Sequence, residues 1–461
     1  MFQLEAENKT YDHALIIGLG ISGFSTARYL RGQGLSVAVS ERRPAAEFDA
    51  DTLSELERLD IAFEDNGHTD AYLKPGCLVI PGQNVALDRP IIRKGIEQGC
   101  RIVGELGLAA GRFQCPVIAI TGTNGKTTVT SLTGDLLKAA GKQVFVGGNI
   151  GIPLLEGLMD GKHYDAVVLE ISSFQAEIAG RFRPDIGVFL NLSPDHLDRH
   201  SDMNTYLAAK LALFQHQTAN DIRILPSDDA ILEKQPPGGA AKPYTFGLDQ
   251  SADFRITDSG VHAFPQQHHY DLSSTKLNSP VNRLNSGAAI AAASLAGCSP
   301  ENIQQGLGQY RLQPHRMEKV ARHRDVSWID DSKATNIGAV QAALDSCRDP
   351  VILIAGGRNK NSDFSLLAPA VRRRVSRLIL LGEAKTHIAE ALSGACPIHM
   401  VEAMDAAVRL AARLAQAGDT VLLAPGCTSF DMFTDYAHRG RVFQQHVRQV
   451  VAEHVSVSRQ D

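Results

Sequence analysis

The chain has little of what marks secreted, fibrous or membrane proteins. Only 6% of its 461 residues are aromatic, a single one is tryptophan, and seven are cysteine. The cysteines are odd in number, far apart and never arranged as CxxC, which argues against a disulfide framework and a zinc site. No apolar run approaches the roughly 20 residues that span a bilayer, and the acidic start of the chain has no signal-peptide core. We therefore expect reduced thiols, a cytoplasmic location and no membrane insertion.

A strong charge of one sign is also missing. The formal net charge is −5, from 46 Lys and Arg against 51 Asp and Glu. Basic residues are scattered, with only short clusters such as residues 372–374. This balance argues against a general nucleic-acid or membrane-surface binder. With 44% hydrophobic residues, a chain of this length can bury several cores, and the length alone suggests about three domains.

Apolar runs of strand length alternate with helix patterns along most of the chain. The pattern predicts an α/β fold of three domains: a Rossmann-like N-terminal domain, a central P-loop ATPase-like domain with a parallel sheet and a small β region, and a Rossmann-like C-terminal domain. A linker at 111–115 and the pair Gln313-Pro314 give the boundaries 1–110, 111–312 and 313–461. Residues 222–277, rich in Asp, Pro, Gly and Gln, are expected to form short strands and turns instead of helix–strand repeats.

The stretch AITGTNGKTT at residues 119–128 is the most informative motif. An apolar run that reads as a buried strand leads into a glycine-bearing loop, and a helix pattern follows over 128–140. Backbone amides of such a loop and the helix N-terminus bind phosphate. Lys126 would supply charge to the β- and γ-phosphates and Thr127 a hydroxyl to Mg²⁺. The first glycine of the standard spacing is replaced by Ile120, so the match to a P-loop is partial.

A second glycine motif, Gly18-x-Gly20-x-x-Gly23, has the spacing of a dinucleotide fingerprint. Glu41 ends the next strand, near the position of a ribose-binding acid. Alone, the motif predicts NAD, but its physics requires only a diphosphate at a helix N-terminus, which a uridine diphosphate also supplies. Arg42 and Arg43 could contact phosphate or a uracil edge. Tight packing of helix on strand without a ligand is the structural alternative.

Polar residues follow three further strand runs. Glu170-Ile171-Ser172-Ser173-Phe174-Gln175 offers a carboxylate for Mg²⁺, or alternatively a capping cluster at a helix start. His196, in NLSPDHLDRH at 191–200, is a candidate second metal ligand or an ordinary surface histidine. The segment DDSKATN at 330–336 is interpreted as a ligand loop, with a solvated turn as the alternative. Lys210 reads most simply as a solvated helix lysine, and Cys427 has no neighbour that would make it a nucleophile.

Taken together, these pieces resemble the Mur ligases, which build the peptide stem of bacterial peptidoglycan with ATP. The matching motifs cover nearly the whole chain: TGTNGKTT (121–128), GGNIG (147–151), EISSFQ (170–175), NLSPDHLDRH (191–200), HR (315–316), DDSKATN (330–336), GGRNKNSDF (356–364) and PGCTSFDMF (425–433). DDSKATN, the HR pair and SFDMF are most similar to the branch that adds D-glutamate. The resemblance also favours uridine diphosphate over NAD at the Gly18–Gly23 turn.

The resemblance implies a role for each domain. The N-terminal domain would hold UDP-N-acetylmuramoyl-L-alanine, the central domain ATP, and the C-terminal domain the incoming D-glutamate. The protein would be a monomer. The nucleotide-sugar residues implied are Gly20, Ile21, Ser22, Glu41, Arg42, Asn149, Ser173 and Gln175. The implied ATP set is Gly122, Thr123, Asn124, Gly125, Lys126, Thr127, Thr128, Asn285, Arg316 and Asp331, and the implied glutamate set is Lys333, Thr335, Lys360, Ser429 and Phe430.

The resemblance also implies a metal centre. Thr127, Glu170, His196 and Lys210 would serve two Mg²⁺ sites, with Lys210 carried as a carbamate, and Lys126, His196 and Lys210 would be catalytic. Three positions depart from the family pattern: Leu284-Asn285, Ile80-Pro81-Gly82 and Glu41-Arg42. Alternatives that the residues leave open are a Mur or folylpolyglutamate-type ligase for another amino acid, including L-glutamate, an NAD-dependent dehydrogenase, and a binding protein gated by ATP.

Overall fold

The computed structural model describes residues 2–227, 229–347 and 350–457. Contacts divide the chain into two compact units. The first holds Met1–Asn191, Asn204–Thr275 and Arg283–Tyr310, and the second holds Leu192–Met203, Lys276–Asn282 and Arg311–Asp461. The segment Leu192–Met203 thus belongs to the C-terminal unit, although its sequence neighbours on both sides belong to the first.

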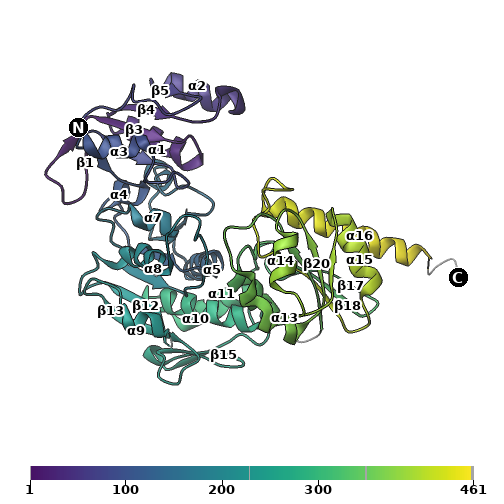
Figure 1. Ribbon diagram of the computed structural model, residues 1–461. Coiled ribbons are helices and arrows are strands. Elements are labelled where there is room, and N and C mark those ends of the chain that lie inside the picture. The colour runs from purple at the N-terminus through teal and green to yellow at the C-terminus, as the bar shows by residue number, and fades with distance from the viewer. Residues whose placement is uncertain (1, 228, 348–349, 458–461) are drawn as a thin grey trace. The chain divides into compact units, whose positions relative to one another are not determined.

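A five-stranded sheet, all parallel, forms the N-terminal part of the first unit (Figure 1). Its strands are β3 (His13–Ile17), β4 (Ser36–Ser40), β5 (Ala62–Glu64), β6 (Leu78–Pro81) and β7 (Arg101–Ile102), with helices α1 (Ile21–Gly32), α2 (Ala50–Arg58), α3 (Pro90–Glu97) and α4 (Glu105–Ala109). The strand order is β5-β4-β3-β6-β7, so the chain reverses direction across the sheet at β3. Ligands of such sheets bind at this reversal, beyond the carboxyl ends of the strands. A small ribbon of β1 (Phe2–Gln3) and β2 (Thr10–Tyr11) precedes it.

A nine-stranded sheet forms the rest of the first unit. Its strands are β8 (Val117–Thr121), β9 (Val144–Gly148), β10 (Ala166–Glu170), β11 (Ile186–Phe189), β12 (Ile222–Pro226), β13 (Lys242–Gly247), β14 (Phe254–Ile256), β15 (Gly260–Ala263) and β16 (His268–Asp271), in the order β16-β15-β14-β13-β12-β11-β8-β10-β9. The short strands expected over 222–277 are present. However, β12 and β13 continue the parallel sheet with helix α9 (Ala230–Lys234) between them, so this stretch does contain a helix–strand repeat. Its sparse apolar residues do not reveal which sheet the strands join.

Helix α5 spans Lys126–Ala139 and so begins earlier than the helix pattern over 128–140 suggested. Helix α10 spans Pro280–Leu295, with proline favourably placed at its start. Lys126 and Thr127 therefore lie in the first turn of α5, where the helix dipole is positive. The remaining helices of this unit are α6 (Glu156–Met159), α7 (Ser173–Glu177), α8 (Met203–Leu211) and α11 (Pro300–Gln309).

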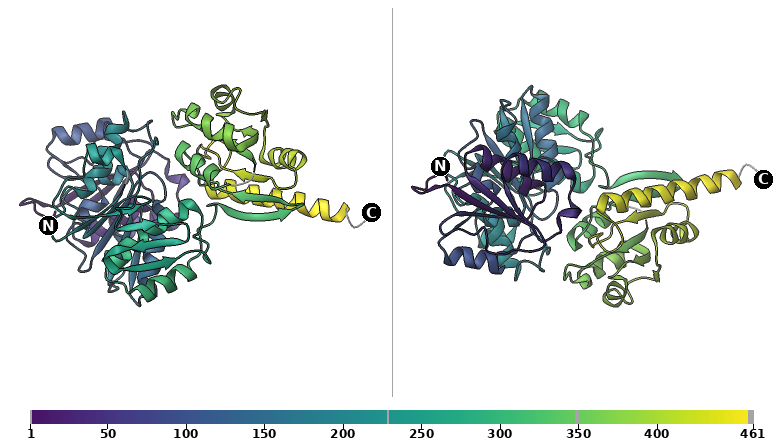
Figure 2. Two further views of the ribbon diagram at one scale, coloured as in Figure 1. Left: turned by 90° about the horizontal axis from the view of Figure 1, so that it is seen from below. Right: turned by 90° about the horizontal axis from the view of Figure 1, so that it is seen from above.

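The second unit is built on a six-stranded sheet. Its strands are β17 (Glu318–His323), β18 (Val326–Asp330), β19 (Val351–Gly356), β20 (Val375–Leu381), β21 (Ile398–Met400) and β22 (Thr420–Leu423), in the order β17-β18-β22-β19-β20-β21, with only β17 antiparallel among the described strands. The helices are α12 (Ile337–Ser346), α13 (Ala368–Arg374), α14 (Lys385–Ala391), α15 (Met404–Leu414) and α16 (Tyr436–Val457). In both views of Figure 2, α16 runs alongside β17. Neither α16 nor any other helix of the described residues combines the length and apolarity of a membrane span.

Side chains of the fully buried strand β19 alternate between two cores, which shows that helices cover both faces of this sheet. Along β19, Leu353 and Ala355 pack in one core with α12, α13 and α14, whereas Ile352 and Ile354 pack in a second core with α15 and α16. Successive residues of a strand point to opposite faces of the sheet, so both faces of this sheet are shielded from solvent. The predicted α/β class with parallel sheets is confirmed.

A buried carboxyl lies where the two sheets of the first unit meet. Glu105, at the start of α4, is 8% exposed, and its Oε1 accepts a hydrogen bond from the Leu155 amide at 3.1 Å. Burial raises its pKa from an ordinary value of 4.5 to about 7. The folded protein therefore binds a proton more tightly than the unfolded chain, and stability falls as the pH rises from about 4.5 through about 7.

Replacing the Glu105 carboxyl by a neutral amide of the same shape should remove the loss of folding stability at high pH. We expect Glu105→Gln to be more stable than the wild type at pH 8, by up to about 3 kcal/mol, and equally stable near pH 4. Thermal unfolding at both pH values measures this. A variant that destabilises the protein equally at both would show that the carboxyl contributes through its hydrogen bond alone.

Candidate active site

The loop between β8 and α5 packs closely against Asn285 of α10. Gly125 caps α5 with a φ of +86°, and a Cβ at this position would lie 2.3 Å from Oδ1 of Asn285. Only glycine fits there. The residues expected to bind ATP phosphates, 122–128, therefore surround the N-terminus of α5, an arrangement that attracts anions. Asn285, predicted for the same ligand, is brought to this loop by α10.

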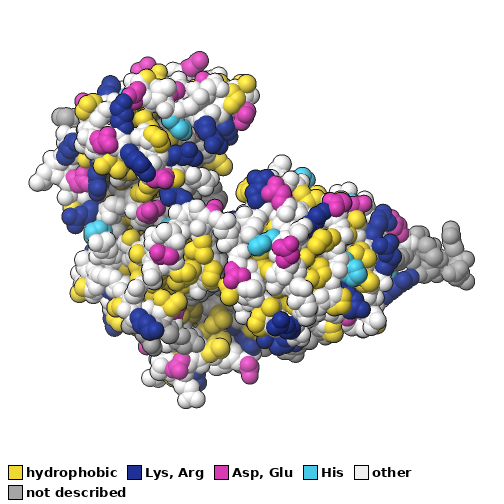
Figure 3. Space-filling model, viewed as in Figure 1, with side chains coloured by type: hydrophobic (Ala, Val, Ile, Leu, Met, Phe, Trp, Pro, Cys, Tyr) yellow, Lys and Arg dark blue, Asp and Glu magenta, His cyan; other side chains and the backbone are white. Residues whose placement is uncertain are grey.

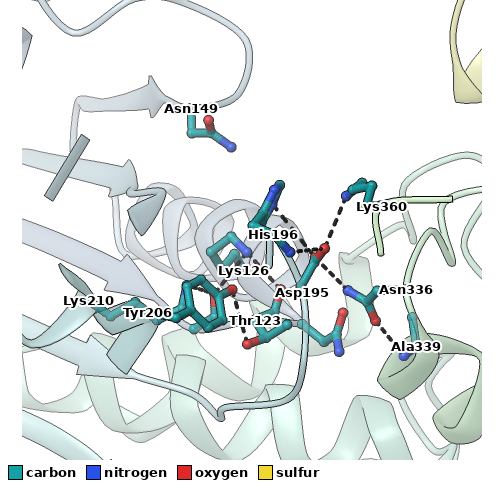
Figure 4. A network of polar contacts seen from close by, with 12 residues as sticks. Thr123, Lys126, Asn149, Asp195, His196, Tyr206, Lys210, Asn336, Ala339 and Lys360 are labelled. Atoms are coloured by element: carbon teal, nitrogen blue, oxygen red, sulfur yellow. Dashed lines mark hydrogen bonds and ion pairs between the residues drawn. The ribbon is translucent and has the colours of Figure 1, made fainter. Parts of the chain in front are cut away.

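The Lys126 side chain bends back over the loop that precedes it in sequence. Its Nζ donates hydrogen bonds to the carbonyls of Gly122 at 2.9 Å and Thr123 at 2.7 Å (Figure 4). The loop is tied to the end of β11 by Asn191, whose Oδ1 accepts from the Asn124 amide at 2.9 Å. The ammonium is thus held at the helix N-terminus by backbone carbonyls.

Lys210 is not the solvated helix lysine that its sequence surroundings suggested. It is 1% exposed, and its Nζ donates to the carbonyl of Gly122 at 2.7 Å. The same nitrogen lies 4.4 Å from the centre of the Tyr206 ring, and the Tyr206 hydroxyl is 3.3 Å from Oγ1 of Thr123. Two lysines from different helices, Lys126 and Lys210, therefore converge on one carbonyl of the phosphate loop (Figure 4).

Glu170 ends the neighbouring strand β10 with a carboxylate that is only half satisfied. The residue is 3% exposed, and its Oε1 accepts from Nδ2 of Asn149 at 2.7 Å. Its buried Oε2 has no hydrogen-bond partner among the described residues. An unpaired buried carboxylate oxygen is costly unless a cation shares it. The oxygen thus fits the hard divalent cation that the sequence suggested for Glu170.

A cavity of about 700 Å³ opens at the carboxyl ends of β3, β4 and β6. The Gly18–Gly23 turn forms one wall, where a Cβ on Gly23 would lie 2.2 Å from the Gly18 carbonyl oxygen, which explains the third glycine of the motif. The opposite wall comes from the nine-stranded part of the unit. The lining includes the predicted Gly20, Ile21, Ser22, Glu41, Arg42 and Asn149. Arg43 and Arg89 add cationic groups, which suit an anionic ligand.

The Glu41 carboxylate accepts hydrogen bonds from backbone amides of the protein. Oε2 accepts from the Leu19 amide at 2.7 Å, and Oε1 accepts from the amides of Arg42 at 2.9 Å and Arg43 at 3.0 Å. Although burial opposes ionisation, these hydrogen bonds and the Arg43 guanidinium lower the pKa of Glu41 to about 2. The carboxylate therefore fastens the glycine turn to the end of β4, which leaves it few lone pairs for a ribose.

Ser173 and Gln175 are not on the wall of this cavity. Both are buried, and Gln175 closes a capping box with Ser172 at the start of α7. This is the capping alternative that the sequence left open. Gln175 instead lines a much smaller cavity together with Glu105.

The second unit holds all five residues expected at glutamate. Lys333 lies with its Nζ 3.8 Å from the centre of the Tyr436 ring, Ser429 is buried, and Phe430 is 63% exposed. Thr335 follows on the DDSKATN loop after β18. Lys360 is not a free cation, because its Nζ pairs with Oδ1 of Asp195 at 3.1 Å (Figure 4).

Asp195 is the residue that reasoning from sequence missed. It is 9% exposed, and besides Lys360 it accepts from Nδ2 of Asn336 at 2.9 Å and from the His196 amide at 2.9 Å. The Lys360 and His196 charges help to keep its pKa low although burial opposes ionisation. Asn336 is fixed in turn as the N-cap of α12, a position that asparagine before a helix signals in sequence. Asp195 thus joins the segment that carries His196 to the candidate glutamate residues.

Arg316 and Asp331, predicted for ATP, lie together in the second unit. The flanking residues His315 and Met317 have φ values of +61° and +46°, and the Asp331 carboxylate accepts from the Met317 amide at 3.1 Å. Burial raises the pKa of Asp331 to about 7. Nδ1 of buried His315 lies 2.7 Å from Asp330, which fixes the turn that presents Arg316.

Comparison with known proteins agrees with this geometry. Family models match three successive parts of the chain: the N-terminal domain of MurD-like Mur ligases over residues 12–104, the Mur ligase middle domain over 120–293, and the Mur ligase glutamate ligase domain over 315–427. A UDP-N-acetylmuramoylalanine--D-glutamate ligase of Desulfotalea psychrophila is 43% identical over 94% of this chain and 95% of its own. The chain belongs to the Mur ligase family. A ligase of the same name from Syntrophotalea carbinolica is 36% identical over 95% of this chain and 97% of its own.

Solved structures show the same Mur ligase fold. The MurF ligase of Thermotoga maritima, in complex with ADP, superposes with a TM-score of 0.64 over 90% of this chain and 95% of its own, at 18% identity. A pseudomurein peptide ligase of Methanothermus fervidus gives 0.60 over 95% of this chain and 100% of its own, at 17% identity. At these identities the likeness concerns the fold alone.

Proposed function

We propose that the protein is an ATP-dependent ligase that joins D-glutamate to the carboxylate of UDP-N-acetylmuramoyl-L-alanine in peptidoglycan precursor synthesis. The observation that carries the proposal is the convergence of Lys126 and buried Lys210 on the phosphate loop, beside the Glu170 oxygen that finds no hydrogen-bond partner in the described part of the chain. The names of the relatives support the amino acid and the acceptor.

Residues 1–110 bind the nucleotide sugar, residues 111–312 bind ATP, and residues 313–461 bind glutamate. The lining of the large cavity supports the first assignment, because arginines and a glycine turn at a helix N-terminus suit a diphosphate. Asn149 lines this cavity and also donates to Glu170, so it connects the sugar site to the candidate metal ligand. Glu41 acts here by shaping the glycine turn. Gln175 lines a smaller cavity together with Ser22 and Gly23 of the glycine turn, so its part in the nucleotide-sugar site is indirect.

The substrate carboxylate attacks the γ-phosphorus of ATP, which gives an acyl phosphate and ADP. The neutral amine of D-glutamate then attacks the acyl carbon, and the tetrahedral intermediate collapses to the amide and phosphate. Lys126 and the amides of the α5 N-terminus neutralise charge on the transferred phosphoryl group. Mg²⁺ held by Thr127 and Glu170 would add further neutralisation when bound.

Lys210 serves as a carbamate. Its amine, once deprotonated, adds to carbon dioxide, and the resulting carboxylate would be available to hold a second Mg²⁺. Burial of this nitrogen supports the proposal, because taking a charged ammonium out of water is costly even where, as here, it donates to the Gly122 carbonyl. His196, in the second unit, remains a metal ligand predicted from the family resemblance. Arg316, Asp331 and Asn285 contact ATP in the same proposal, and the protein works as a cytoplasmic monomer.

Replacing Lys360 or Ser429 by alanine should raise the KM for glutamate far more than the KM for ATP. A glutamate carboxylate needs cationic and hydroxyl partners, and both side chains lie in the second unit. There Lys360 is held in place by its ion pair with Asp195. Steady-state kinetics with each substrate varied in turn measures the split. Lys385→Ala, which removes a lysine paired with Glu402 on the surface of the same unit, is the matched control. If both variants raise the KM for ATP and leave the KM for glutamate unchanged, these residues serve nucleotide binding and the glutamate assignment is wrong.

Phosphate release against a panel of amino acids tests the function itself. With UDP-N-acetylmuramoyl-L-alanine and ATP present, D-glutamate should support turnover and L-glutamate, glycine and meso-diaminopimelate should not. Turnover with another member of the panel would assign the chain to a different ligase. Reduction of NAD in the absence of ATP would instead assign the chain as a dehydrogenase. The mixed charges on the face shown in Figure 3 favour neither nucleic acid nor an anionic membrane as an additional ligand.

A further inference from the structure

Two cysteines outside the proposed active site lie side by side in the N-terminal sheet. Cys77 immediately precedes β6 and Cys100 immediately precedes β7. These strands are parallel neighbours, with Leu78 opposite Arg101, so the cysteines occupy facing positions one residue earlier. Their Sγ atoms are 3.5 Å apart, and both thiols are free.

The backbone holds this pair in place from both sides. The Gly76 amide donates to the Gln98 carbonyl at 3.0 Å, and the Arg101 amide donates to the Cys77 carbonyl at 2.9 Å. The Cys100 thiol also donates to the Lys74 carbonyl at 3.2 Å. Neighbouring strands lie about 4.8 Å apart, a backbone separation that a disulfide can span, so side-chain rotation can bring the sulfurs to the bonding distance of about 2.05 Å.

We propose that Cys77 and Cys100 are a modification site that forms a reversible disulfide by exchange with a low-molecular-weight disulfide. Cys100 is half-buried and is the sulfur that the reagent reaches, whereas Cys77 is 4% exposed. The Cys100 thiolate attacks one sulfur of the reagent, forms a mixed disulfide and releases one small thiolate. Cys77 then gives up its proton to solvent, and its thiolate attacks the Sγ of Cys100 and displaces the second small thiolate. Two protein thiols are oxidised by two electrons, and the reagent is reduced to two thiols.

The chemistry of the Cys77 thiol fits its role as the second nucleophile. Burial and the neighbouring Cys100 raise the pKa of Cys77 to about 12. Cys77 is therefore a poor first nucleophile, but it faces a sulfur held at short range once Cys100 carries the leaving group.

The bond would close a covalent loop around a part of the chain that lines the large cavity. Gly82, Gln83, Asn84, Val85 and Arg89 all lie between the two cysteines. Oxidation should therefore restrict opening of β6, the following loop and α3, because a disulfide limits the conformations of the loop it closes. Reduction should reverse the effect.

The test uses the full-length reduced protein incubated with oxidised glutathione, then alkylated, digested and analysed by mass spectrometry. We expect one crosslinked species joining the peptides of Cys77 and Cys100, with the other five of the seven cysteines alkylated. Amide hydrogen exchange over residues 78–99 should slow in the oxidised protein and recover after dithiothreitol. A fully alkylated protein, a stable glutathione adduct on Cys100, or a disulfide to any other cysteine would each overturn the proposal.

Two variants separate the steps. Cys77→Ser should stop at a glutathione adduct on Cys100. Cys100→Ser should gain neither an adduct nor a disulfide at Cys77, because that thiol is buried. Cys115→Ser, which leaves the pair intact, is the matched control and should form the crosslink as the wild type does. Ligase activity is not a readout here, so the outcome is independent of the proposed function.

Discussion

Lys126→Ala should lower ligation by at least about 10²-fold while leaving affinity for the nucleotide sugar nearly unchanged. The ammonium lies at the N-terminus of α5 on the carbonyls of Gly122 and Thr123. The large cavity that would hold the nucleotide sugar does not include Lys126 in its lining. Phosphate release measures the first quantity, and calorimetric titration with UDP-N-acetylmuramoyl-L-alanine measures the second.

Lys138→Ala is the matched control, because this lysine lies on the exposed side of the same helix and pairs only with Asp135 among the partners that the structure gives it. It should retain wild-type turnover. Substantial ligation by Lys126→Ala would show that the loop after β8 is a structural turn, and loss of nucleotide-sugar binding would place that ligand at this loop.

Lys210→Ala should be nearly inactive and should regain part of its activity with added formate or acetate. The small carboxylate would enter the space left by the side chain and replace the negative charge that the proposed carbamate would supply to Mg²⁺. The cavity is confined, because Lys210 is 1% exposed, so formate should act better than acetate. Turnover measured over a series of carboxylate concentrations gives the rescue.

The control for that rescue is Lys126→Ala, which lacks a cation and should gain nothing from an added anion. Lys210→Ala that is fully active, or inactive at every carboxylate concentration while still folded, would contradict the carbamate. Mass spectrometry of the native protein under carbon dioxide gives an independent readout of the modification.

Much of the fold was predictable because its strands are buried on both faces. Runs such as those of β3, β8, β10 and β19 are continuous apolar stretches bounded by glycine or polar residues, so the α/β class followed directly. The phosphate loop and the glycine turn were predictable for a related reason. Their spacing is dictated by close approach of backbone to a helix start, which leaves a local trace in sequence.

Other features leave no local trace. Burial of Lys210 depends on Gly122, which is 88 residues away, and nothing around Lys210 in sequence indicates it. Membership of Leu192–Met203 in the second unit rests on Asp195 meeting Lys360 and Asn336, contacts that span more than a hundred residues. The Glu170 oxygen that lacks a partner within the described ranges, and the hydrogen bonds of Glu41 to backbone amides, are likewise properties of the folded chain.

Heavy-oxygen transfer tests the central claim most directly. UDP-N-acetylmuramoyl-L-alanine labelled with heavy oxygen in its carboxylate is incubated with the enzyme, ATP, Mg²⁺ and D-glutamate, and the products are weighed by mass spectrometry. Ligation through an acyl phosphate predicts one heavy oxygen in the released phosphate, one in the new amide, and a product heavier by one D-glutamate residue. Phosphate without label, or a nucleotide sugar that gains no glutamate, would contradict it.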